Sequence, residues 1–211
     1  MGYYPIFLNL VGRRCVIIGG GAVAERKVDT LLGVGATVTI VSPSLTERLE
    51  SWVREGHIKH VGRDYRPGDL AGYELAFVAT DDREVNAVVA SEGRERGVWV
   101  NAADDPAHCD FILPSVLRRG DLVVAVATGG LSPALSRAIR EELEDYFTED
   151  YTLLAKVVSE VREELKQNSS HPDAETWRKA LNGDLRRIIK DGNKSGAKAY
   201  LLKRLGVERC K

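Results

Sequence analysis

A run of six small residues near the N-terminus is the first place where this sequence could do chemistry. The run comprises Gly19, Gly20, Gly21, Ala22, Val23 and Ala24. It matches the pattern GxGxxA if Gly19, Gly21 and Ala24 take its three small positions. The first glycine permits a tight turn, the second lets the backbone approach a pyrophosphate, and the third small residue lets a helix pack on a strand. The run therefore indicates a dinucleotide phosphate site, with a ligand-free glycine-rich connection as the simpler alternative.

An acidic pair follows another apolar run of the sequence. Asp81 and Asp82 come directly after Thr80 and precede a segment of helical periodicity at 83–96. Acidic side chains stabilise the positive end of a helix, so capping is the simpler role for this pair. Thr80 and Asp81 are also candidates for contact with the edge of a bound dinucleotide, because ligands of open α/β sheets lie outside the carboxyl ends of the strands.

A second acidic pair, Asp104 and Asp105, precedes Pro106 rather than a helix. Capping therefore explains it less well, and a catalytic or ligand-binding role stays as open as a structural one. His108 and Cys109 follow closely enough to suggest a metal site with Asp104. No two of these groups share a helix face, so solvated loop residues are the simpler interpretation and we expect no metal site.

The expected end of the second strand lacks the carboxylate that usually binds the ribose hydroxyls of NAD. The residues there are Val41, Ser42, Pro43 and Ser44. We expect Ser42 and Pro43 to lie along the cofactor, with the Ser42 hydroxyl as a candidate ribose ligand. Since neither a carboxylate nor an arginine stands at this point, the residues leave the choice between NAD and NADP open.

The elements that must position these groups follow from hydropathy periodicity. Strands are expected at 15–18, 37–41, 58–61, 75–79, 98–101 and 111–113, and helices at 22–35, from a cap at Ser44, and at 83–96. Strands that are apolar on both faces and alternate with helices indicate a parallel sheet covered by helices on both faces. The first 113 residues therefore predict an α/β fold of the Rossmann type.

The pattern changes after Pro114. A strand is expected at 121–127, a helix at 132–147 with Pro133 in its first turn, and an amphipathic helix at 151–166. Two or three further helices should fill the remainder, interrupted at Gly183 and at 191–196. We expect an NAD-binding domain at 1–113, a dimerisation region at 114–148 and a small all-helical domain at 149–211.

Composition excludes several classes of protein. With 211 residues, 44% hydrophobic and 29% charged, the chain is typical of a globular protein, and its apolar runs are too short to span a membrane. The net charge of −1 gives no reason to expect nucleic acid or a membrane surface, although residues 151–211 carry 14 Lys and Arg against 8 Asp and Glu. Three widely spaced cysteines and the lack of a secretion signal favour a cytoplasmic location.

Several segments together resemble a known family, the precorrin-2 dehydrogenases and sirohydrochlorin ferrochelatases that form the NAD-dependent module of siroheme synthase. The matching segments are 4–8, 19–27, 79–82, 101–105, 111–115 and 126–144, in the family's order. Each segment alone is weak evidence for the family, but the whole set in this order is specific to it. The helical C-terminal part resembles the family only in length, basic character and the segment 177–181.

The resemblance implies that the chain oxidises precorrin-2, a polycarboxylate tetrapyrrole, to sirohydrochlorin with NAD as cofactor. In some members insertion of iron(II) follows. Asp104 aligns with the family's catalytic aspartate, and the family is a homodimer. Candidate substrate contacts are Asp105, Thr128, Gly129, Gly130 and Arg137, because backbone amides at the glycines and the arginine can hold carboxylates. We expect precorrin-2, sirohydrochlorin and, with the second activity, Fe²⁺ as partners.

Two other functions stay open at this point. One is a non-catalytic NAD-sensing module whose basic helical tail docks on a partner or on nucleic acid. The other is a dehydrogenase of a small hydroxy acid, although the usual histidine base with an arginine clamp is not evident near the expected strand ends.

Overall fold

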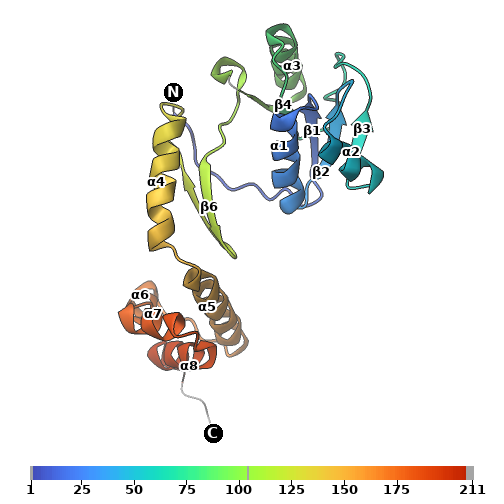
Figure 1. Ribbon diagram of the computed structural model, residues 1–211. Coiled ribbons are helices and arrows are strands. Elements are labelled where there is room, and N and C mark those ends of the chain that lie inside the picture. The colour runs from blue at the N-terminus through green and yellow to red at the C-terminus, as the bar shows by residue number, and fades with distance from the viewer. Residues whose placement is uncertain (1, 104, 208–211) are drawn as a thin grey trace. The chain divides into compact units, whose positions relative to one another are not determined.

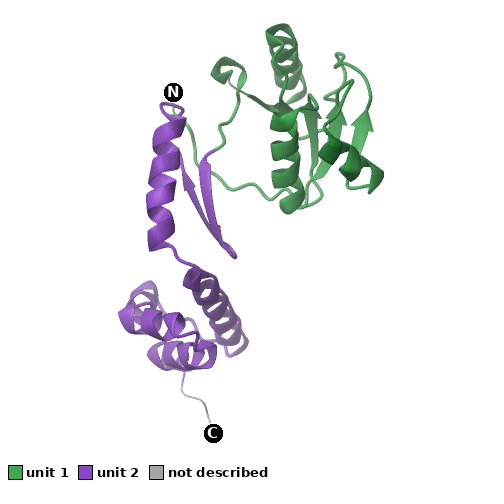
Figure 2. Cartoon of the chain, viewed as in Figure 1, with its two compact units in different colours: residues 1–113 green, residues 114–211 purple. Residues whose placement is uncertain are grey.

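The computed structural model describes residues 2–103 and 105–207, shown in Figure 1. The chain forms two compact units, Met1–Leu113 and Pro114–Lys211, coloured separately in Figure 2. The predicted further division at residue 148 stays a prediction. Asp104, the predicted catalytic residue, lies outside the described residues.

The first unit contains a parallel sheet. Within the described residues its strands are β1 (Arg14–Ile18), β2 (Thr37–Val41), β3 (Ile58–Val61), β4 (Leu75–Val78) and β5 (Trp99–Ala102), in the order β3-β2-β1-β4-β5. All four neighbouring pairs are parallel. The connecting helices are α1 (Ala22–Gly33), α2 (Glu47–Arg54) and α3 (Arg83–Arg96). The predicted Rossmann-like sheet is confirmed, and the strand order reverses between β1 and β4, where such folds bind dinucleotides.

Helices cover both faces of this sheet, which explains why its strands are almost wholly apolar. On one face Val28 of α1 and Leu49 of α2 pack into a core with Ile17 and Ile40 of the strands. On the other face Val89 belongs to a core formed with strand residues such as Val78. Because each central strand contributes to both cores, its side chains are buried in both directions.

Two sequence expectations within this unit are wrong. Residues 111–113 form no strand; instead the Phe111 ring packs edge-on against Phe77, with centroids 5.7 Å apart, so its apolar character serves packing. The second helix is capped by Thr46 rather than Ser44, since the Thr46 hydroxyl accepts from the Leu49 N–H at 3.3 Å. The Ser44 carbonyl instead accepts a hydrogen bond from the Ser42 hydroxyl at 2.8 Å.

The second unit begins with a hairpin that packs against a helix. Strand β6 (Ser115–Arg119), which the sequence analysis missed, pairs antiparallel with β7 (Leu122–Val126). Helix α4 (Pro133–Tyr146) lies along this hairpin, as Figure 1 shows. The Ser132 hydroxyl caps it by accepting from the Leu135 N–H.

The rest of the second unit is helical. Helices α5 (Asp150–Gln167), α6 (Ala174–Ala180), α7 (Gly183–Lys190) and α8 (Lys194–Arg204) surround a core that includes Val161, Leu185 and Leu201. The sequence predicted a break between helices at Gly183. In the structure Gly183 is the first residue of α7, and Asn182 caps that helix. Throughout the described residues, no helix combines the length and apolar character needed to cross a bilayer.

Candidate functional site

The glycine run forms the turn that joins β1 to α1. Gly19 has a φ of +111°, which side chains other than glycine rarely adopt, and a Cβ at this position would lie 2.3 Å from the Ala79 carbonyl oxygen. The Gly19 N–H donates to the Val41 carbonyl at 2.9 Å. The turn is therefore wedged between the ends of β2 and β4, where only glycine fits.

The last glycine of the run faces open space. Gly21 is the N-cap of α1. Among the described residues no side chain caps this helix end, and none has an atom within 4 Å of a Cβ built on Gly21. The first backbone hydrogen bond of the helix runs from the Glu25 N–H to the Gly21 carbonyl at 3.0 Å. The N–H groups of the first turn are thus available to an anion in the space in front of Gly21.

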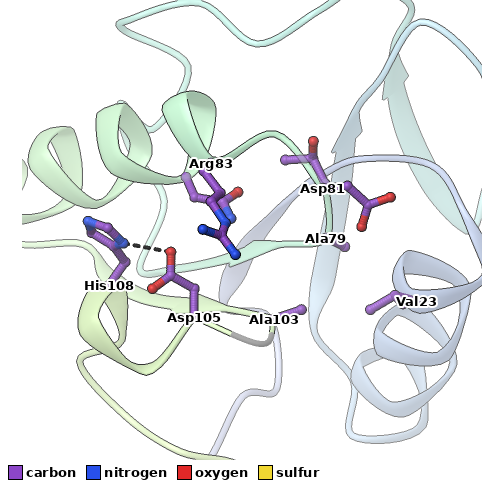
Figure 3. A pocket seen from close by; sticks show the side chains of 9 residues that line it. Val23, Ala79, Asp81, Arg83, Ala103, Asp105 and His108 are labelled. Atoms are coloured by element: carbon purple, nitrogen blue, oxygen red, sulfur yellow. Dashed lines mark hydrogen bonds and ion pairs between the residues drawn. The ribbon is translucent and has the colours of Figure 1, made fainter.

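A cavity of about 440 Å³ opens at the carboxyl ends of β4 and β5, shown in Figure 3. It is lined by Val23, Ala79, Thr80, Asp81, Arg83, Asn86, Ala103, Asp105 and His108. These residues come from α1, the β4 end, α3 and the segment after β5. The fold therefore brings together groups up to 85 positions apart in sequence, and three of the predicted cofactor residues, Val23, Thr80 and Asp81, belong to this wall.

A carboxylate and an imidazole form a bonded pair in the cavity wall. His108 Nδ1 lies 2.7 Å from Asp105 Oδ2, and both side chains are partly buried. The pair stands on a 3-10 turn, Pro106–His108, that follows β5. His108 therefore stays partly exposed on a short turn, with its ring bonded to Asp105.

The thiol of Cys109 ties this turn to the end of β5. Its Sγ lies 3.2 Å from both the N–H and the carbonyl oxygen of Ala102, and 3.3 Å from the Asp105 carbonyl oxygen. Burial raises the pKa of the Cys109 thiol, which keeps it protonated and able to donate. Cys109 thus acts as a structural contact that positions Asp105.

The two carboxylates of the first acidic pair, Asp81 and Asp82, have different environments. Asp82 caps α3, since its carboxylate accepts from the N–H groups of Glu84 at 2.9 Å and Val85 at 3.2 Å. The Thr80 hydroxyl accepts from the Asp82 N–H at 3.1 Å. Asp81 takes no part in the cap, and Figure 3 shows it on the side of the cavity nearer Val23.

The other predicted cofactor residues near the glycine turn differ in burial and in contacts. Ala22 is exposed on the first turn of α1, and Ala24 is fully buried in the core beneath it. A Cβ on Gly20 would lie 2.0 Å from the Ser44 carbonyl oxygen. Ser42 is buried with its hydroxyl hydrogen committed to Ser44, so ribose binding by this group stays a prediction.

Pro43 lines a second, smaller cavity of about 270 Å³ beside α2 and β3.

Of the predicted substrate contacts, Asp105 lies in the first unit, while Thr128, Gly129, Gly130 and Arg137 lie in the second. The Thr128 hydroxyl donates to the Ser132 carbonyl and accepts from the Ser132 N–H, both at 3.0 Å. Gly129 and Gly130 form an exposed left-handed turn before α4, and Arg137 is exposed on that helix.

Sequence reasoning missed two residues of the cavity wall, Arg83 and Asn86. Asn86 is only 4% exposed, and its Oδ1 has no hydrogen-bond partner among the described residues. An asparagine inside an otherwise regular helix was the available signal, because asparagine is a poor helix former. Within the same described residues, no three His, Cys, Asp or Glu side chains form a cluster able to hold a metal ion.

These features fit a dinucleotide. The open space before Gly21 and the first turn of α1, which no described side chain caps, suit a pyrophosphate. The adjoining cavity is lined in part by Asn86, whose buried amide oxygen has no partner among the described residues. The fold and this edge define a Rossmann-type NAD(P)-binding domain. The chain belongs to the family described as "Putative NAD(P)-binding", whose model matches residues 6–115. A second model, "Sirohaem biosynthesis protein central", matches residues 119–146.

Known proteins confirm the resemblance inferred from the motifs. The chain is 39% identical over 209 residues to a siroheme synthase of Chromobacterium violaceum, covering 98% of this chain and 44% of that protein. It is 36% identical over 204 residues to a siroheme synthase of Nitrosomonas europaea, covering 95% of this chain and 43% of the relative. The chain thus spans less than half the length of these curated relatives.

One solved structure resembles nearly the whole chain. It is named "SirC, precorrin-2 dehydrogenase", with a TM-score of 0.74, 26% sequence identity, and coverage of 97% of this chain and 99% of that one. The similarity extends through both units.

Proposed function

We propose that this chain is an NAD-dependent dehydrogenase that oxidises precorrin-2 to sirohydrochlorin. One observation carries the proposal: the glycine turn leads into α1, and Val23 of that helix lines a cavity whose wall also holds a carboxylate and imidazole pair. A non-catalytic NAD sensor needs the turn but has no need of the pair. The similarity to siroheme synthases and to a named precorrin-2 dehydrogenase supports the choice of substrate.

The chemistry requires a hydride acceptor and a proton acceptor. Bound NAD⁺ supplies the hydride acceptor. The chain must then stabilise the positive charge that develops on the macrocycle and remove a proton from it, which carboxylates and imidazoles do well. The resemblance assigns this task to Asp104. We propose that Asp105 and His108 extend it, because Asp105 holds the imidazole at Nδ1 and leaves Nε2 as the site that takes or gives a proton.

Cations on the chain match the charge of the substrate. Figure 3 shows the Arg83 side chain extending toward Asp105 in the cavity, and no ion pair of Arg83 occurs within the described part of the chain. Arg137 is exposed on α4. Guanidinium groups bind carboxylates through paired hydrogen bonds, so both residues suit a polycarboxylate ring.

We also propose that the chain acts as a homodimer through its second unit. A two-stranded hairpin is only marginally stable by itself and needs further apolar packing. Leu117 of β6 is buried, but its neighbour Val116 is 39% exposed, and Leu131 before α4 is 89% exposed. An apolar surface of this kind is typical of a protein interface. A second copy of the chain would cover it.

The activity is tested by supplying precorrin-2 and NAD⁺ without oxygen. NADH absorbance and the sirohydrochlorin spectrum should rise together, and NADP⁺ in place of NAD⁺ tests the cofactor choice. Addition of Fe²⁺ or Co²⁺ afterwards shows whether the metallated spectrum forms. Tight NAD⁺ binding without turnover, together with binding to a protein or nucleic acid, would favour the sensor instead.

Asp104→Ala is the variant that tests the catalytic assignment. It should fold and bind NAD⁺ as the unaltered chain does, but lose most turnover. Asp64→Ala is a matched control, since Asp64 is exposed and its carboxylate makes no described ion pair. Unchanged turnover in Asp104→Ala would remove Asp104 from the mechanism.

A further inference from the structure

The proposed chemistry gives no role to the amide of Asn86, which belongs to the cavity wall. Asn86 lies in the first turn of α3, where its backbone N–H donates to the Asp82 carbonyl at 3.0 Å. Its side chain is 4% exposed, and Oδ1 is shut off from solvent with no partner among the described residues. A buried polar atom without a hydrogen bond costs about 1–3 kcal/mol, so such atoms are retained for a reason.

The other buried asparagine of the sheet edge shows the contrast. Asn101 is 7% exposed, and its Nδ2 donates to the Phe111 carbonyl at 2.9 Å. That amide holds the segment after β5 in place. Asn86 performs no comparable task inside the described protein, yet it lines the cavity.

The position of the cavity indicates which half of a dinucleotide reaches Asn86. The pyrophosphate site lies before Gly21 at the end of β1, next to the reversal of strand order. In this fold one nucleotide half lies over the β1 and β2 side and the other over the β4 side. The cavity is on the β4 and β5 side, so its occupant is the nicotinamide half.

The chemistry of the two possible occupants separates them further. A buried carbonyl oxygen needs an N–H donor, and it repels carboxylates, which are the dominant groups at the rim of the proposed tetrapyrrole substrate. The nicotinamide ring carries a carboxamide, whose NH₂ donates and whose oxygen accepts. An asparagine side chain has the same two groups in the same geometry, so the two amides are complementary.

We propose that Asn86 binds the carboxamide of nicotinamide and thereby positions the ring in the cavity. This inference rests on the cofactor part of the proposed function. It makes Asn86 a cofactor-positioning residue, and it explains why a helix places a poor helix former with an unpaired oxygen at this point.

The test compares NAD⁺ with ADP-ribose, which lacks the nicotinamide, by calorimetric titration of the full chain. In Asn86→Leu, which keeps nearly the same volume but removes the amide, the Kd for NAD⁺ should rise about tenfold or more, as loss of hydrogen bonding to a ligand predicts. The Kd for ADP-ribose should stay within about twofold, because that ligand never reaches Asn86.

A change on the ligand side provides an independent check. The 3-acetylpyridine analogue of NAD⁺ replaces the carboxamide NH₂ by a methyl group. The unaltered chain should bind this analogue more weakly than NAD⁺, and Asn86→Leu should bind the two about equally. Asn101→Leu is the matched control: it should lower the thermal midpoint of the free protein, whereas Asn86→Leu should not.

Two results with Asn86→Leu would contradict the inference. Equal weakening of NAD⁺ and ADP-ribose in Asn86→Leu would make Asn86 a structural residue, and unchanged binding of both would remove it from the site. Asn86→Ser serves the same comparison if the leucine variant does not fold. If the unaltered chain bound neither NAD⁺ nor ADP-ribose, the proposed cofactor itself would be wrong, and the inference with it. If it bound both but failed to oxidise precorrin-2, only the proposed activity would fail.

Discussion

His108 Nδ1 lies 2.7 Å from Asp105 Oδ2, across the single 3-10 turn that follows β5. The bond fixes the ring so that Nε2 is its free nitrogen, and the Cys109 thiol holds the same turn against Ala102. Side chains that are locked by neighbours in this way are typical of functional sites, because catalysis depends on orientation.

Asp105→Asn should therefore lower turnover while leaving NAD⁺ affinity unchanged. The amide has the shape of the carboxylate but cannot stabilise a protonated imidazole, and loss of general acid-base catalysis typically costs about 100-fold in rate or more. The prediction is checked by measuring turnover across a range of pH and NAD⁺ affinity by titration. His108→Gln should give a similar loss. Normal turnover in both variants would show that the pair is only structural.

Alanine substitution at two residues of the glycine turn, Gly19 and Gly21, should affect different properties: fold stability at Gly19 and NAD⁺ binding at Gly21. Gly19→Ala should destabilise the fold by several kcal/mol, because its Cβ would lie 2.3 Å from the Ala79 carbonyl oxygen at a φ of +111°. Gly21→Ala should fold with normal stability, since its Cβ meets no atom within 4 Å, yet bind NAD⁺ poorly, because the methyl group projects into the pyrophosphate space.

Urea unfolding and NAD⁺ titration of the two variants separate these effects. Gly33→Ala, at the end of α1 and also without a described neighbour within 4 Å, is the control: it should leave NAD⁺ affinity unchanged and should not lower stability. Normal NAD⁺ affinity in Gly21→Ala would place the pyrophosphate elsewhere.

Glu92 of α3 should make stability depend on acidity. Its carboxylate accepts from the Tyr65 hydroxyl and from the N–H groups of Gly68 at 2.9 Å and Leu70 at 3.2 Å, and it pairs with Arg96. Burial opposes ionisation, but these hydrogen bonds together hold the pKa of Glu92 below its usual value. Its contribution is therefore present above the unfolded pKa of about 4.3 and is lost as pH falls through the folded value.

Glu92→Gln should cost about 1–3 kcal/mol of unfolding free energy at neutral pH, since an amide cannot accept all of these bonds. The difference from the unaltered chain should shrink toward pH 3. Urea titrations of both proteins at several pH values provide the measurement. A difference that is constant with pH would mean that ionisation of Glu92 does not matter.

Val116→Lys should shift a dimer toward the monomer. Val116 is 39% exposed on the hairpin, paired with Ala125, and a lysine there would place a charge in the proposed interface. Light scattering after size-exclusion chromatography measures the mass. Val88→Lys, at an exposed position of α3 in the first unit, is the control. A dimer that tolerates Val116→Lys as well as Val88→Lys would place the interface on another surface.

The class of fold and the glycine turn could be predicted from the order of residues alone. Alternating apolar runs and helical periods require a sheet buried on both faces, and three adjacent glycines after a strand mark a backbone that must turn tightly and leave space for a ligand. Both are local properties, expressed over fewer than about ten residues each. The two elements that periodicity misassigned, 111–113 and β6, are short segments whose state depends on distant partners: Phe77 for the first and β7 for the second.

Which polar residues share the cavity depends on how distant segments of the chain pack together. Arg83 and Asn86 follow β4, whereas Asp105 and His108 follow β5, and nothing in their spacing joins them. They meet because β4 and β5 are parallel neighbours whose carboxyl ends open at one edge of the sheet. The unpaired oxygen of Asn86 likewise appears only when every neighbour is in place, because a missing hydrogen bond is a property of the surroundings and not of the residue.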